Sequence, residues 1–101
     1  MSNFRNSSMT QLLSVEEINQ RVSNLLDWKL EGNKLKCIKI FKDFVEAISF
    51  VNKLVAPAEA SQHHPDLKVS YNKVIVILTT HDAGGLTEKD FSMAQIISSL
   101  S

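Results

Sequence analysis

All three histidines of this 101-residue chain lie within one short segment. His63 and His64 form a pair that Pro65 follows, and His81 comes after two threonines. Imidazole titrates near neutral pH, so a group of histidines can both donate and accept protons under cellular conditions. The residue types and their spacing therefore predict an acid–base site.

Two β-like runs, residues 67–71 and 74–78, separate the histidine pair from His81. The two residues between the runs, 72–73, predict a β-hairpin with a two-residue turn. In the register that this turn imposes, His64 faces His81 across the strands, at roughly 5 Å between Cβ atoms. The hairpin is thus predicted to bring the histidines together.

The residues alone leave three interpretations of the histidine group open. Three imidazoles with a water are a known zinc arrangement, although neighbours in an extended segment, such as His63 and His64, point to opposite sides. The rings can instead be satisfied polar groups at the end of a sheet. The third interpretation is metal-free proton transfer, for which imidazoles on opposite sides of a pocket supply an acid and a base.

The N-terminal half of the chain predicts a helix followed by a hairpin. Ser14 and Glu17 have the spacing of a capping box. Apolar residues then recur at helical spacing, which predicts a helix to about Leu26. Residues 28–31 and 34–41 are predicted to be the two strands of the first hairpin.

The C-terminal half predicts a second helix, a second hairpin and a third helix. Asp43 is predicted to cap a second helix, which Pro57 ends or kinks before the histidines. After the second hairpin, in which Tyr71 is predicted to face the core, Thr87 and Asp90 form a capping box that starts the third helix. We therefore expect an α+β fold: a four-stranded antiparallel sheet with three helices packed on one face, in the order helix–hairpin–helix–hairpin–helix.

Composition narrows the function classes. Eleven basic residues balance eleven acidic ones, so there is no electrostatic case for nucleic-acid or membrane binding. We expect a flexible tail over residues 1–11 and a single domain over residues 12–101. The N-terminus lacks an apolar signal stretch, which favours a cytoplasmic protein. Cys37 is the only cysteine and is predicted to be buried packing.

A spaced set of residues resembles the signature of the pterin-4a-carbinolamine dehydratase family. The resemblance extends over about residues 13–97, and the runs 71–74 and 80–87 are similar to the family as well. The residues that carry the spaced signature are Glu59, His63, His64, Pro65, Tyr71, His81 and Asp90.

Membership of this family implies a lyase that dehydrates 4a-hydroxytetrahydropterin to quinonoid dihydropterin during pterin recycling, with no metal and no cofactor. It implies that His63, His64 and His81 are catalytic, with His63 and His81 acting as general acids toward opposite faces of the pterin. Asp90 would orient the ring of His81. The substrate-binding residues implied by the resemblance are Glu59, Gln62, His63, His64, Pro65, Thr79, Thr80, His81 and Asp82.

The resemblance also implies partners. A homodimer or homotetramer is expected, and Ile75 and Ile77 on the outer face of the predicted hairpin agree with self-association. Some family members act as dimerisation partners of transcription factors and bind a helical segment. Binding such a partner without essential catalysis is therefore the alternative function, but retention of three histidines favours an enzyme.

Overall fold

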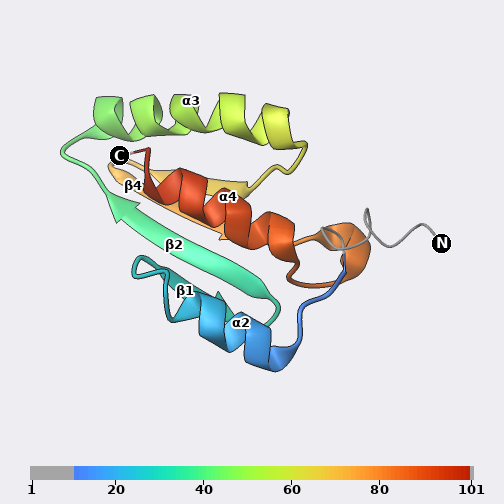
Figure 1. The fold of residues 1–101 in the computed structure, drawn as a ribbon. Coiled ribbons are helices and arrows are strands. Elements are labelled where there is room, and N and C mark those ends of the chain that lie inside the picture. The colour runs from blue at the N-terminus through green and yellow to red at the C-terminus, as the bar shows by residue number, and fades with distance from the viewer. Residues whose placement is uncertain (1–10, 101) are drawn as a thin grey trace.

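Residues 11–100, which the computed structural model describes, form three α-helices, one 3-10 turn and a four-stranded antiparallel sheet (Figure 1). In chain order the elements are α2 (Val15–Val22), β1 (Trp28–Glu31), β2 (Lys34–Ile40), α3 (Phe44–Ser61), β3 (Asp66–Ser70), β4 (Lys73–Leu78), η1 (His81–Ala83) and α4 (Glu88–Ser98). This is the predicted α+β order. All but the last residue of the predicted tail lies outside the described residues.

The strand order β1-β2-β4-β3 places β2 and β4 at the centre of the sheet. Helices α3 and α4 lie side by side over one face of the sheet, and α2 lies against β1 (Figure 1). Alternate side chains of the strands point into the core beneath the helices. The buried apolar side chains that the strands contribute are Trp28, Leu35, Cys37, Val74, Val76 and Leu78.

The predicted register of the second hairpin is wrong by two residues. Val69 pairs with Val74 and Ser70 with Lys73, so the turn lies at Tyr71–Asn72. The backbone of Asn72 accepts from Phe41 N–H at 2.8 Å, and its side-chain amide donates to Phe41 O at 2.9 Å. These bonds to the end of β2 hold the turn one position earlier than predicted.

Two predictions change with this register. Tyr71 is 66% exposed in the turn, with a φ of 53°, and does not face the core. His64 and His81 are not cross-strand partners, because β3 begins at Asp66 and His81 lies in η1, beyond the end of β4.

The capping predictions are confirmed, and two helix ends differ from expectation. Ser14 and Glu17 exchange both bonds of the capping box, but α2 ends at Val22 rather than near Leu26. Ser23, the next residue, turns its hydroxyl back onto Gln20 O at 2.6 Å, a local bond of the kind that competes with helix continuation.

Helix α3 continues through Pro57 to Ser61. A proline in a helix interior removes one backbone bond and costs about 3 kcal/mol. Burial of Leu54 and Ala58 on either side of the proline offsets this cost. Pro57 therefore does not end the helix, and residues 58–61 form its last turn.

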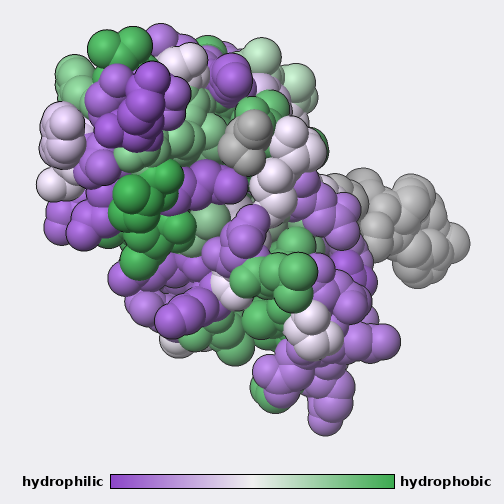
Figure 2. Space-filling model, turned by 90° about the vertical axis from the view of Figure 1, so that its left-hand side faces the viewer, coloured by the Kyte–Doolittle hydropathy of each residue, from purple (hydrophilic) through white to green (hydrophobic). Residues whose placement is uncertain are grey.

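Apolar side chains also remain on the surface. On the helix-free face of the sheet, Ile38 and Ile40 are more than half exposed, as are Val45 and Val55 on α3. Figure 2 shows hydrophobic side chains in separate patches among hydrophilic ones. Within residues 11–100, no helix has the length and hydropathy needed to cross a bilayer.

Candidate functional site

The histidine pair follows directly from the end of α3. Gln62 closes the helix in the left-handed conformation, with a φ of 55°. Its N–H donates to Glu59 O at 3.3 Å, and the next N–H, of His63, donates to Ala58 O at 3.1 Å. These are the two bonds of a Schellman motif. The motif turns the chain sharply, so that His63 enters the protein while His64 stays at the surface.

His63 is paired with Asp90 inside the protein. Its Nε2 lies 2.6 Å from Asp90 Oδ1, and the two side chains are 9% and 0% exposed. A carboxylate accepts hydrogen bonds, so the Nε2 proton points to Asp90 and Nδ1 remains for other contacts. The prediction that Asp90 orients His81 is wrong in its partner, because Asp90 Oδ1 is paired with His63, and Asp90 Oδ2 accepts from the Thr80 hydroxyl and the Thr87 N–H.

His64 has a carboxylate partner of its own. Its Nε2 lies 2.6 Å from Glu59 Oε2, and these side chains are 58% and 66% exposed. Glu59 lies in the last turn of α3, four residues before His63. The two adjacent histidines thus have the same kind of partner in two different environments, one buried and one in solvent.

His81 begins the turn η1 and is exposed. Its ring makes no hydrogen bond with any other residue between 11 and 100, which leaves both ring nitrogens available. The turn is closed by Gly84, whose φ of 80° suits a residue without a Cβ.

A cavity of about 240 Å³ brings most of the predicted site residues together. Its lining residues are Gln62, His63, His64, Thr79, Thr80, His81, Asp82 and Lys89. Two predicted binding residues, Glu59 and Pro65, do not line it. Lys89 was not predicted, although its place between the capping-box residues Thr87 and Asp90 puts it on the same first helical turn.

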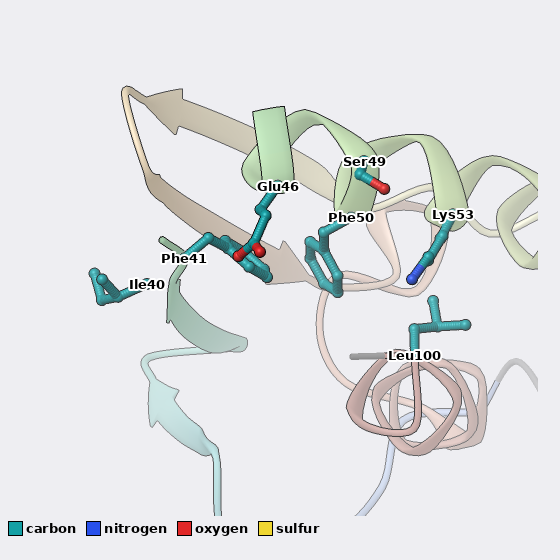
Figure 3. Close-up of a pocket in the computed structure, with 7 residues that line it drawn as sticks. All are labelled: Ile40, Phe41, Glu46, Ser49, Phe50, Lys53 and Leu100. Atoms are coloured by element: carbon teal, nitrogen blue, oxygen red, sulfur yellow. The ribbon is translucent and has the colours of Figure 1, made fainter. Parts of the chain in front are cut away.

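A larger cavity, of about 530 Å³, lies at the other end of α3 (Figure 3). Lys53, Phe50 and Leu100 surround part of it, and Glu46 points toward Phe41. It contains no histidine and no paired acid–base groups. Size alone favours this cavity, but all three histidines line the smaller one.

The smaller cavity can support proton transfer at more than one position. Three imidazoles border it, two of them held by carboxylates and one free, and the Lys89 side chain adds a cation. Among residues 11–100, no group of three or more histidine, cysteine, aspartate or glutamate side chains is arranged to hold a metal ion. The geometry therefore suits general acid–base chemistry on a small molecule.

Comparison with known proteins identifies a family that this chain matches. The model of the family described as pterin 4 alpha carbinolamine dehydratase matches residues 11–100. A Trichodesmium erythraeum protein named a putative pterin-4-alpha-carbinolamine dehydratase is 78% identical over 92% of this chain and 100% of its own length. A Cyanothece protein of the same name is 60% identical over 92% of this chain and 96% of its own.

A solved structure agrees with these relatives. The crystal structure of a transcriptional coactivator/pterin dehydratase from Brucella melitensis superposes with a TM-score of 0.83 at 33% sequence identity. The match covers 87% of this chain and 96% of the Brucella chain. The topology described above is therefore shared with this protein.

Proposed function

Because the chain belongs to the pterin-4a-carbinolamine dehydratase family, we propose that it dehydrates 4a-hydroxytetrahydropterin to quinonoid dihydropterin. In this reaction the C4a hydroxyl leaves as water and the proton on N5 is lost. One group must protonate the leaving oxygen while another accepts the N5 proton. The observation that carries the proposal is the convergence of His63, His64 and His81 on one cavity.

The surroundings of each histidine suggest its contribution. His63 is held by the buried Asp90, which leaves its Nδ1 to face a bound molecule. His64 can exchange protons with solvent and with Glu59. His81 lines the same cavity with a free ring. We assign these three rings the acid–base roles. No metal or organic cofactor enters the proposed reaction.

A coupled assay that follows carbinolamine decay tests this function. Wild-type protein should be active with a chelator present, and His64→Ala and His81→Ala should each reduce turnover by about 100-fold or more. Lys53→Ala, which changes only the larger cavity, is the control and should leave turnover unchanged. Loss of activity on adding the chelator would favour a zinc enzyme, and undiminished activity in both histidine variants would refute the acid–base roles.

The proposal includes a homo-oligomer and a cytoplasmic location, which are carried over from the family resemblance. Exposed apolar side chains on α3, among them Val45 and Val55, support self-association. Analytical ultracentrifugation should show a dimer or tetramer for the wild type and a smaller species for the double variant Val45→Glu/Val55→Glu. A monomeric wild type would contradict this part of the proposal.

A second candidate function is binding of a helical protein partner, and it is favoured by the name of the Brucella protein as a transcriptional coactivator. The apolar surface of α3 that carries Val45 and Val55 suits the apolar face of an amphipathic helix. A library of displayed helical peptides tests this function. Enrichment of amphipathic sequences by the wild type, but not by Val45→Glu/Val55→Glu, would support it, and equal enrichment by both proteins would contradict it.

A further inference from the structure

The hydroxyl of Thr80 reaches the carboxylate that holds His63. Thr80 Oγ1 donates to Asp90 Oδ2 at 2.7 Å, while the other carboxylate oxygen, Oδ1, takes the Nε2 proton of His63 at 2.6 Å. Thr80 is 6% exposed and Asp90 is fully buried. The carboxylate that pairs with His63 is therefore held in place by the hydroxyl of a second buried residue.

Counting protons fixes the direction of this network. A threonine hydroxyl has one proton, and that of Thr80 is given to Asp90, so its oxygen must accept from Thr87 Oγ1, 2.8 Å away. Thr87 Oγ1 in turn accepts from Lys89 N–H at 3.2 Å. Each hydrogen bond in this series is donated in the direction of Asp90. The carboxylate is therefore an acceptor for Thr80 and for His63 alike.

The backbone of Thr80 closes the loop that carries His81. Its N–H donates to Gly85 O at 3.0 Å, and its carbonyl accepts from the N–H groups of Ala83, Gly84 and Gly85 at 3.1, 3.0 and 3.3 Å. The side chain of Thr80 is thus tied to the His63–Asp90 pair, and its backbone is tied to the turn that begins with His81.

We propose that Thr80 is a positioning residue that fixes the ring orientation of His63 and the placement of His81 together. Without the hydroxyl, Asp90 Oδ2 retains only the Thr87 N–H, at 2.9 Å, and Thr87 Oγ1 loses its acceptor. The carboxylate is then held by one hydrogen bond fewer, and the partner that selects the Nε2–H tautomer of His63 is less firmly oriented. The expected effect on kcat rests on the proposed dehydratase function, whereas the expected effect on the tautomer of His63 does not.

The test uses Thr80→Val, which keeps the shape without the hydroxyl, and Thr80→Ser, which restores it. Imidazole ¹⁵N chemical shifts of His63, recorded without substrate at a pH where the ring is neutral, report its tautomer. We expect one tautomer, protonated on Nε2, in the wild type and in Thr80→Ser, and a mixture in Thr80→Val. In the carbinolamine assay Thr80→Val should lower kcat by up to about 100-fold with little change in KM.

Ser98→Ala is the matched control, because it removes the hydroxyl that accepts from Trp28 Nε1 at 2.9 Å, far from the site. It should change neither the tautomer of His63 nor kcat. A wild-type tautomer in Thr80→Val would overturn the proposal, whether or not the wild type dehydrates the pterin. If Thr80→Val does not fold, the wild type still decides: a slowly exchanging Thr80 hydroxyl proton supports the network, and one that exchanges freely with water refutes it.

Discussion

His63 Nε2 lies 2.6 Å from Asp90 Oδ1, although 27 residues separate them in sequence. The contact joins the end of α3 to the first turn of α4, and both side chains are buried. Asp90 has a second role in the same position, because its Oδ2 accepts from Thr87 N–H and completes the capping box of α4. One carboxylate therefore starts the helix and orients the imidazole.

Asp90→Asn should lower the free energy of unfolding by more than Asp→Asn does at an exposed helix cap. Three donors, from His63, Thr80 and Thr87, point at the carboxylate, and an amide turns its own NH₂ group toward at least one of them. A buried donor without an acceptor costs about 1–3 kcal/mol, which urea unfolding can measure. Asp43→Asn is the control, since asparagine caps a helix as well as aspartate does. Equal losses in the two variants would contradict the network.

Glu59→Gln, which changes the carboxylate partner of His64, should lower activity and leave stability unchanged. Glu59 and His64 are both largely exposed, and exposed pairs contribute less than about 1 kcal/mol. We expect the urea midpoint to stay within error of the wild type, while turnover of the carbinolamine falls by less than in His64→Ala. A large loss of stability would show that this pair has a structural role.

Tyr71→Gly should stabilise the protein. Tyr71 has a φ of 53° and is 66% exposed, so its side chain gains little from packing and its backbone is held where a Cβ is unfavourable. The strain is about 1 kcal/mol, and glycine removes it. The control Tyr71→Ala keeps the strain and should not raise the thermal midpoint. A midpoint that rises equally in both variants would assign the effect to the lost aromatic ring instead.

The sequence predicts what is local. The capping boxes at Ser14 and Thr87 and the cap at Asp43 depend on residues three positions apart, and all are present. The alternation of apolar residues that predicts the strands is also a pattern of near neighbours in the sequence. Local rules fail at Pro57, where propensity favours a break but burial of the flanking helix surface keeps α3 intact to Ser61.

The arrangement of the site depends on contacts between distant segments, and these are not visible in the spacing. The hairpin register depends on the bonds between Asn72 and Phe41. The choice of His63 rather than His81 as the partner of Asp90 depends on how α4 packs against the end of α3. The group of residues is therefore predictable from the sequence, whereas the pairing within it is not.

Cys37 gives a prediction about pH. It is 1% exposed, and burial raises the pKa of its thiol. In the unfolded chain the thiol ionises near its ordinary pKa of about 8.5, whereas the native state keeps the proton to higher pH. Its contribution to the free energy of unfolding is therefore complete below about pH 8.5 and falls as pH rises above that value.

Urea unfolding of the wild type and of Cys37→Ala at pH 7 and pH 10 measures this contribution. The wild type should lose more stability between the two pH values than the variant does, because only the wild type has the thiol. Other groups titrate equally in both proteins. An equal loss in the two proteins would show that the thiol ionises as easily in the folded state as in the unfolded one.

The central claim is that His63, His64 and His81 serve one bound pterin. The test is a titration with 7,8-dihydrobiopterin that follows the side-chain NMR signals of the three histidines, Phe50 and Lys53. We expect the signals of all three histidines to shift together and give one dissociation constant, with the signals of Phe50 and Lys53 at the larger cavity unaffected. Shifts confined to Phe50 and Lys53, or three histidines that respond separately or not at all, would contradict it.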